Sequence, residues 1–413
     1  MWGATSSEKG GYRDFIAEVD LSSFRRLPFE NKIAFFLLRF RLNGSPVFAD
    51  GRNLIQSTTE NMTKSGMQGL AGVELEFTNF QTPSQDGYGP SGGRHNLGGF
   101  LNINPPRALR PLTGGMFGYS VSRPIMNKEY FHSIYNMAKE LGCPIESWHT
   151  ESGPGVYEAQ ALAVSPVNRM ADKVSLFRFL TKALGVEHGV TPCFMAKPVH
   201  GLPGNSGHIH VSLNDLEGNN LFARESKDEQ APWADVAHLS DMGRQFLAGL
   251  IDALPDIMPL FCPNINSYKR LVENFWAPVT ISWGQEDRAA SIRLIAPPTC
   301  KPGATRFEVR IPGADFHPHY ALTAIFRAGL RGIERKMNIE TPPLSQLPKG
   351  QKAAKLPNTL EKAVERFQAQ DSVARQIMGE EFVDFYTISR RHELALWREA
   401  VTDWEFTRYI EQV

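Results

Sequence analysis

The sequence has few cysteines, no excess of charge of either sign and no long hydrophobic run. Its 413 residues include 4 cysteines, and no two of them form a Cys-x-x-Cys pair, so neither a disulfide framework nor a zinc site is expected. The 44 Lys and Arg residues balance 44 Asp and Glu, which gives no global field for nucleic acid or an anionic membrane. No apolar segment reaches the roughly 18 residues of a membrane span, and no signal-peptide pattern opens the chain. These absences predict a globular cytoplasmic protein that binds neither nucleic acid nor a membrane.

Three short segments do stand out, because in each of them ionisable residues alternate with apolar ones. They are residues 74–76 (ELE), 208–210 (HIH) and 306–310 (RFEVR). Side chains at i and i+2 leave the same face of a strand, so each segment can direct its charges into one space while Leu75, Ile209 and their counterparts pack behind it. For one segment alone, a solvated strand face is the simpler interpretation. Three together favour a shared lumen in which metal ions bridge a polyanion.

The hydrophobic pattern predicts mixed α and β structure. A small β unit is expected over 24–50, a connecting helix over 53–67 and a strand over 72–80. Further helices are expected over 128–141, 171–187, 239–254, 318–336 and most of 360–412.

Residues 81–115 are rich in Gly, Pro, Asn and Ser, which predicts a long loop of functional importance. This segment contains a formal GxGxxG match at 87–92. Because Pro90 interrupts the match and no strand leads directly into it, a dinucleotide site is not expected.

Six motifs follow one another in an order that is more informative than any one of them. They are 72–77 (GVELEF), 151–158 (ESGPGVYE), 204–212 (GNSGHIHVS), 266–271 (NSYKRL), 283–293 (WGQEDRAASIR) and 306–310 (RFEVR). This order and spacing resembles the glutamine synthetase superfamily, from about Asp20 to the C-terminus. The resemblance implies ATP-driven amide formation, in which ATP converts a carboxylate of glutamate to an acyl phosphate that an amine then attacks.

The resemblance also implies two divalent metal ions in each site. It assigns the first metal to Glu76, Glu151 and Glu158, and the second to Glu74, His208 and Glu308. Oxygen-rich ligation with a single imidazole suits Mg²⁺ or Mn²⁺ rather than zinc.

Five arginines are expected to hold anionic groups. By resemblance, Arg288, Arg293 and Arg306 form the phosphate clamp, while Arg270 and Arg310 grip the carboxylate of the amino-acid substrate. The planar guanidinium suits both tasks because it stays charged and makes bidentate contacts. The remaining expected contacts are nucleotide at His210, Ser212 and Glu146, the amine at Tyr119, and glutamate at Gly204 and Asn205.

The sequence departs from the family pattern where the amine should bind. Trp276 stands where the family's mobile flap carries a glutamate that helps to deprotonate ammonium, a substitution that also resembles γ-glutamylamine ligases. An indole takes no proton and adds a large apolar wall, which favours a bulkier amine as substrate. Alternatively, Trp276 only packs the flap and Glu273 replaces the lost acid. Val156 also replaces a glutamine that is common in the acidic loop.

The expected fold is α+β, with a partial N-terminal β-grasp domain over 1–66 and a catalytic domain over 67–413 whose curved antiparallel sheet is flanked by helices. In the family, a complete β-grasp domain supplies an acidic loop to the neighbouring subunit of a homo-oligomeric ring. That loop has no evident counterpart here, which puts assembly and full activity in question.

The expected function is ATP-dependent ligation of glutamate to an amine larger than ammonia. Three alternatives stay open at this point: glutamine synthetase using ammonia, a catalytically silent structural or regulatory relative, and a kinase of the phosphagen type. The complete set of expected metal ligands and arginines argues against a silent protein, since each group is costly without its ligand.

Overall fold

Strands pair into two separate sheets in the computed structural model, which describes residues 14–30, 33–83, 97–273, 277–348 and 350–413, apart from the side chains of 160–163. The small sheet contains β1 (Ile16–Arg26), β2 (Ala34–Leu42) and β3 (Ser45–Pro46) in that order. The strands of the large sheet are β4 (Met67–Gln81), β5 (Ile145–Thr150), β6 (Val156–Pro166), β7 (Val190–Cys193), β8 (Ile209–Asp215), β9 (Trp283–Gln285), β10 (Ile292–Ile295) and β11 (Arg306–Val309). Within the described residues their order is β5-β6-β4-β8-β11-β10-β9, with β7 paired to part of β4, and only the β9–β10 pair is parallel.

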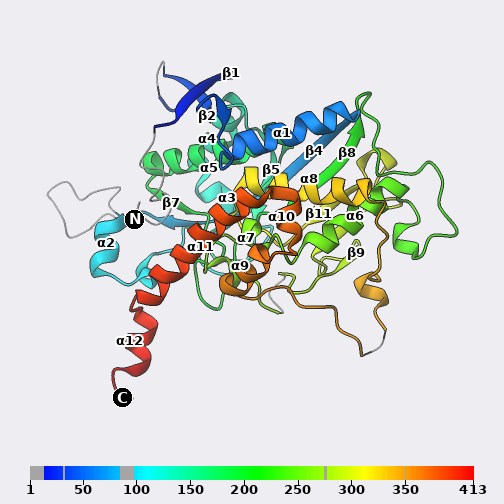
Figure 1. Ribbon diagram of the computed structural model, residues 1–413. Coiled ribbons are helices and arrows are strands. Elements are labelled where there is room, and N and C mark those ends of the chain that lie inside the picture. The colour runs from blue at the N-terminus through cyan, green and yellow to red at the C-terminus, as the bar shows by residue number, and fades with distance from the viewer. Residues whose placement is uncertain (1–13, 31–32, 84–96, 274–276, 349) are drawn as a thin grey trace.

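Helices surround the large sheet, and all of the described helices come after the small sheet in the sequence. They are α1 (Gly51–Lys64), α2 (Leu97–Ile103), α3 (Ser122–Met126), α4 (Lys128–Glu140), α5 (Val167–His188), α6 (Asp241–Ala253), α7 (Met258–Phe261), α8 (Pro318–Glu334), α9 (Leu360–Gln368), α10 (Val373–Met378), α11 (Glu380–Glu399) and α12 (Asp403–Tyr409). Figure 1 shows the small sheet, in dark blue, beside α4 and α5, and α12, in red, projecting from the body. No helix in the described part of the chain is long and apolar enough to cross a membrane.

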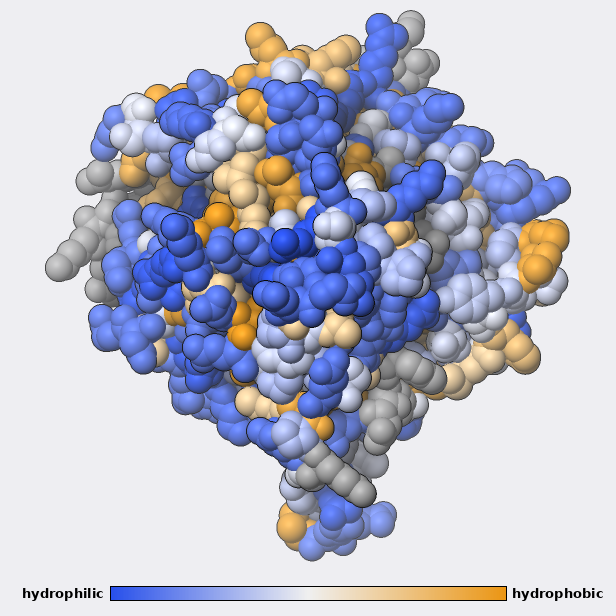
Figure 2. All heavy atoms as spheres, turned by 90° about the vertical axis from the view of Figure 1, so that its right-hand side faces the viewer, coloured by the Kyte–Doolittle hydropathy of each residue, from blue (hydrophilic) through white to orange (hydrophobic). Residues whose placement is uncertain are grey.

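The core lies between the large sheet and the helices α1, α5, α6 and α8, whose apolar faces are buried. Helices α6 and α8 approach closely because glycines meet at their contact. A Cβ added to Gly332 would lie 2.1 Å from the carbonyl oxygen of Gln245, and one on Gly249 would lie 2.4 Å from that of Ala328. By contrast, the surface in Figure 2 is mainly hydrophilic, with apolar residues interspersed among polar ones.

The α+β fold and most predicted elements are confirmed. One prediction was wrong: the segment 81–115 is not loop throughout, because its described part contains α2 and a short 3-10 helix at Pro106–Ala108. The prediction that most of 360–412 is helical is confirmed, and the structure divides this region into α9 to α12, with Gly379, at a φ of 91°, between α10 and α11. The GxGxxG match at 87–92 lies outside the described residues.

Strand β1 begins earlier than the β unit predicted over 24–50. Its side chains are exposed at nearly every position, with only Ser23 buried. The proposed domain boundary near residue 66 stays a prediction.

Candidate active site

Neighbouring strands of the large sheet place the ionisable residues of the three alternating segments opposite one another. Glu76 of β4 pairs in register with Glu158 of β6, and Glu308 of β11 pairs with His210 of β8. The apolar residues between them, including Leu75 and Ile209, have no exposed surface. The prediction that each segment directs its charges to one face and packs its apolar residues behind is confirmed.

A cavity of about 360 Å³ opens above these strands, within the usual range for small-molecule sites. Many of the residues predicted from the sequence line it: Glu74, Glu76, Tyr119, Glu151, Glu158, Gly204, His208, Arg270, Arg288, Arg293, Glu308 and Arg310. Residues separated by more than 200 positions in the chain therefore share one site.

The first group of possible metal ligands contains Glu74, Glu308, His208 and His210. His208 Nδ1 lies 3.3 Å from Glu74 Oε2 and 3.5 Å from Glu308 Oε1. His210 Nε2 lies 3.2 Å from Glu74 Oε1, and the ligand atoms of Glu74, His210 and Glu308 lie within 4.8 Å of one another. Both imidazoles thus reach the carboxylates, whereas the sequence assigned only His208 to a metal.

Two observations make this group suitable for a divalent cation. His208 Nε2 is buried, and it has no hydrogen-bond partner among the described residues. Burial alone would raise the pKa of Glu74, but hydrogen bonds to His208 and His210 hold it well below the usual range. The pKa of Glu308 is also lowered despite burial, by His208 and Arg310. Both carboxylates are therefore ionised, as metal ligands must be.

The second group contains Glu151, Glu158 and His149. His149 Nε2 lies 2.9 Å from Glu151 Oε1 and 3.9 Å from Glu158 Oε2, and the three ligand atoms can meet within 4.8 Å. The pKa of Glu151 is lowered, since the His149 hydrogen bond outweighs the effect of burial. Glu76, the third predicted ligand, faces Glu158 and accepts a hydrogen bond of 2.6 Å from the Ser206 N–H.

Sequence reasoning did not single out His149, although a signal was present. His149 and Glu151 are separated by one residue at the end of β5, which is the same alternation that marked the other segments.

Tyr119 lies at the rim of the cavity in a strained backbone conformation. Its φ is 56°, a left-handed value that bulky residues rarely adopt. A hydrogen bond of 2.7 Å from its N–H to the Thr150 carbonyl fixes the position, and its ring stacks on His149 with centroids 4.5 Å apart. Burial and the charges of Glu151 and Glu158 raise the pKa of its hydroxyl, which favours the neutral phenol.

The arginines are held by Glu308 and by backbone carbonyls. Arg293 contacts Glu308 at 3.0 Å and also pairs with Glu286, while Arg310 pairs with Glu308. The buried Arg270 donates 2.9 and 3.3 Å hydrogen bonds to the carbonyls of Ile311 and Arg310, and burial lowers its pKa.

Four other residues predicted from the sequence are not among the described residues that line the cavity. Arg306 contacts the first group through His210, since its Nε donates to His210 Nδ1 at 3.3 Å. Asn205 is fully buried and donates 2.8 Å to the Met195 carbonyl, which gives it a structural role beside Gly204. Ser212 follows His210 on β8, and Glu146 is exposed on β5. Trp276 lies outside the described residues, so its predicted role stays a prediction.

Acidic clusters and arginines around one cavity on a curved sheet define an enzyme that handles a polyanionic substrate together with divalent metal ions. The sequence matches the family described as glutamine synthetase, catalytic domain, over residues 48–409, and the chain belongs to this family. It is an ATP-dependent glutamate–ammonia or glutamate–amine ligase.

The chain is similar to members of this family that are named for different amine substrates. The chain is 37% identical over 97% of its length to type-1 glutamine synthetase 2 of Dictyostelium discoideum, of which the match covers 73%. It is 31% identical over 97% of its length to glutamate–isopropylamine ligase of a Pseudomonas species, and 30% identical over 99% to γ-glutamylethanolamide synthetase of Streptomyces coelicolor, each covered to 82%. A solved structure titled apo GmaS without ligand matches with a TM-score of 0.78 and 25% identity, covering 97% of this chain and 86% of that one.

Proposed function

We propose that this protein joins the γ-carboxylate of glutamate to an amine larger than ammonia, through γ-glutamyl phosphate. The observation that carries the choice of amine is the replacement of the flap glutamate by Trp276, since an indole removes the base that ammonium needs. Similarity to an isopropylamine ligase and an ethanolamide synthetase supports the same choice. A homo-oligomeric ring is part of this proposal.

Val156 adds support from within the cavity. It lines the cavity with only 4% of its surface exposed, and its carbonyl accepts a 2.9 Å hydrogen bond from the Glu151 N–H. Its apolar side chain therefore lines the same cavity as Glu151 and Glu158. An alkyl group loses less by contact with valine than with the glutamine that the family commonly has there.

The two acidic groups would hold Mg²⁺ or Mn²⁺, which would screen the phosphoryl groups of ATP and polarise the transferring phosphate. Glu74, Glu308 and the two histidines would form one site, and Glu76, Glu151 and Glu158 the other. Within this arrangement Arg293 and Arg306 lie beside the first group, where they can neutralise charge on the phosphoryl oxygens. Arg270 and Arg310 also line the cavity, where Arg310 pairs with Glu308 and Arg270 donates to the Arg310 carbonyl, and they can grip the α-carboxylate of glutamate.

Tyr119 is positioned to line the path of the amine. Its ring stacks on His149 at the rim, so an incoming amine passes an aromatic face beside Glu151 and Glu158. Such a combination favours an organic ammonium ion, which gains both charge attraction and contact with the ring.

The test is the rate of ADP release with glutamate and Mg²⁺ or Mn²⁺, for ammonia, methylamine, isopropylamine, ethanolamine, polyamines and aromatic amines. We expect kcat/KM for at least one organic amine to exceed that for ammonia by about tenfold, or 1.4 kcal/mol. Omission of glutamate gives the background ATPase rate, and a Glu308→Gln preparation shows any contaminating activity. Highest activity with ammonia would favour a glutamine synthetase, in keeping with the Dictyostelium relative. No ADP release with any amine would favour the silent alternative.

A further inference from the structure

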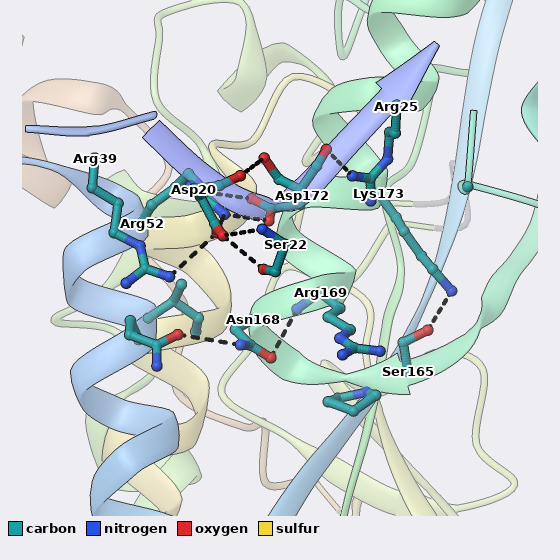
Figure 3. Close-up of a pocket in the computed structure, with 15 residues that line it drawn as sticks. Asp20, Ser22, Arg25, Arg39, Arg52, Ser165, Asn168, Arg169, Asp172 and Lys173 are labelled. Carbon is teal, nitrogen blue, oxygen red and sulfur yellow. Dashed lines mark hydrogen bonds and ion pairs between the residues drawn. The ribbon is translucent and has the colours of Figure 1, made fainter. Parts of the chain in front are cut away.

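A second cavity, of about 490 Å³, lies between the small sheet and the helices that follow it. We call it the sheet-side pocket. Its wall is formed by β1, β2, α1, the end of β6 and the first turns of α5 (Figure 3). The volume is enough for a small metabolite.

The charged side chains of this pocket are mainly positive. Five of them are cationic and two are carboxylates: Arg25, Arg39, Arg52, Arg169 and Lys173, against Asp20 and Asp172. The wall therefore carries three more positive than negative charges.

Both carboxylates are already engaged by neighbours. Asp20 Oδ2 lies 2.8 Å from Arg52 and 3.3 Å from Arg39, while Asp172 receives two hydrogen bonds from Arg52, of 2.9 and 3.0 Å, and lies 2.8 Å from His319 Nε2. Although burial alone would raise it, hydrogen bonds from Ser22 and Arg52 lower the pKa of Asp20 to about 2. The two acids thus neutralise Arg39 and Arg52, and they leave little negative charge to balance the other cations.

The other three cations, Arg25, Arg169 and Lys173, form no ion pair with Asp20 or Asp172, although the charge of Glu146, outside the pocket lining, acts on Lys173. Arg25 donates to the carbonyls of Leu141, at 2.8 Å, and of Ser23. Lys173 donates to the Ser165 hydroxyl. The guanidinium of Arg169 has no acceptor among the described residues, and Figure 3 shows its side chain extending into the pocket.

These three charges also act on one another. Burial lowers the pKa of Lys173, and the nearby Arg169 and Arg25 lower it further. Like charges brought together in this way destabilise the empty pocket, and a bound anion removes that cost.

The first turn of α5 adds to the positive potential. The helix has 22 residues, Pro166 precedes it without a side-chain cap, and its first turn contains no acidic residue. The positive end of the helix dipole therefore faces the pocket without compensation.

From the cavity and its surplus of cations, we infer that the sheet-side pocket binds a small metabolite with two negative charges on phosphoryl or carboxylate oxygens. Arg25, Arg169 and Lys173 are its ligands, and they come from β1 and α5. The bound anion therefore joins the small sheet to the catalytic body. This inference concerns binding alone and does not depend on which amine the enzyme uses.

The test is calorimetric titration and thermal unfolding of the full-length protein with inorganic phosphate and with succinate, against chloride at equal ionic strength. Metal is removed with EDTA, because the catalytic cavity then has five carboxylates against four arginines and attracts anions weakly. We expect phosphate or succinate to raise Tm where chloride does not, and the tighter of the two identifies phosphoryl or carboxylate chemistry. Arg169→Gln should weaken this binding by about tenfold or more.

Arg26→Gln is the matched control. Arg26 is an exposed residue of β1 that does not line the pocket, so this substitution removes one positive charge outside the pocket. It should leave binding unchanged. Arg293→Gln, which removes a cation that lines the catalytic cavity, tests that cavity as the source of the signal. Equal Tm shifts for all three anions, or loss of binding in Arg293→Gln with retention in Arg169→Gln, would overturn the inference.

Discussion

The catalytic cavity and the sheet-side pocket are both rich in arginine, but they differ in how their charges are balanced. Five carboxylates face four arginines in the cavity, whereas two carboxylates face five cations in the pocket. The cavity is nearly neutral and can accept ATP only when divalent cations bind with it. The pocket needs no such help. The same residue type therefore serves two kinds of anion binding, one dependent on metal and one not.

The two sites also differ in the backbone that supports them. Several acidic residues of the cavity and Arg293 come from the paired strands β4, β6, β10 and β11, whose register fixes the distance between opposite side chains, and the other lining residues come from the loops that adjoin the sheet. Those of the pocket come mainly from β1, β2 and the first turns of α1 and α5. Because strand register leaves little freedom to reposition a side chain, we expect single substitutions in the cavity to have larger effects than those in the pocket.

The largest effect is expected for Glu308→Gln in the cavity. Glu308 has 1% of its surface exposed, contacts His208 and pairs with Arg293 and Arg310. The amide keeps the shape but removes the charge that a metal ion needs, so kcat should fall by about 100-fold or more. Far-ultraviolet circular dichroism should be unchanged.

Glu286→Gln is the matched control for that substitution. Glu286 also pairs with Arg293, but it does not line the cavity. Its rate should stay within about threefold of the wild type, which is less than 1 kcal/mol. An equal loss in both variants would show that Glu308 acts by holding Arg293 and would refute its role as a ligand.

A smaller effect, on stability rather than rate, is expected for Asp172→Asn in the sheet-side pocket. The carboxylate joins Arg52 of α1 to His319 of α8, so its loss should reduce the free energy of unfolding by about 2–3 kcal/mol. Asp252→Asn removes the acid of an exposed pair with Arg331 and should cost about 0.5 kcal/mol or less. Equal costs in urea unfolding would contradict the structural role of Asp172.

The effect of Asp172→Asn should also depend on pH. Burial alone would raise the pKa of Asp172, but hydrogen bonds and charge from His319 and Arg52 lower it below the usual value of an aspartate. A carboxyl whose folded pKa is depressed stabilises the protein above its unfolded pKa and loses that contribution as pH falls. The difference between wild type and variant should be constant above about pH 5 and shrink below about pH 4. A difference that is the same at pH 3 and pH 7 would exclude this linkage.

Metal addition should distinguish the catalytic cavity from the sheet-side pocket, through a change in the free energy of unfolding that is smaller than the one expected for Asp172→Asn. Mn²⁺ at ten times its dissociation constant should stabilise the metal-free protein by about 1.4 kcal/mol. This gain should be reduced in Glu158→Gln, because Glu158 belongs to the second acidic group and the first group stays intact, and it should be unchanged in Arg169→Gln. A Mn²⁺ effect of the same size in Glu158→Gln as in the wild type would show that Glu158 holds no metal.

The catalytic cavity could be predicted from the sequence better than the sheet-side pocket for a physical reason. Predicted ligands such as Glu74 and Glu76 alternate along one strand, so their spacing shows that they point to the same face. His149 and Glu151 carried the same signal but were not recognised as a pair. The second imidazole of the first group, His210, required the register between β8 and β11.

The sheet-side pocket left no comparable pattern in the sequence. Arg169 and Lys173 lie four residues apart on α5, but Arg25 lies on β1, and nothing in the sequence shows that β1 packs near α5. Strand β1 itself begins before the β unit that the sequence predicted. Tertiary packing, which no local periodicity encodes, brings these cations together.

The smallest effect is expected for Val156→Gln, which restores the polar residue common in the family and tests whether the cavity discriminates among amines. Val156 is nearly buried and lines the cavity together with Glu151 and Glu158, so an amide there offers a hydrogen bond near the amine and removes an apolar contact. The ratio of kcat/KM for ammonia to that for the best organic amine should rise by about three- to tenfold. Val156→Leu, which enlarges the side chain without adding polarity, should not raise it. The same rise in both variants would mean that size alone excludes larger amines, and an unchanged ratio in Val156→Gln would leave Trp276 as the residue that selects the amine.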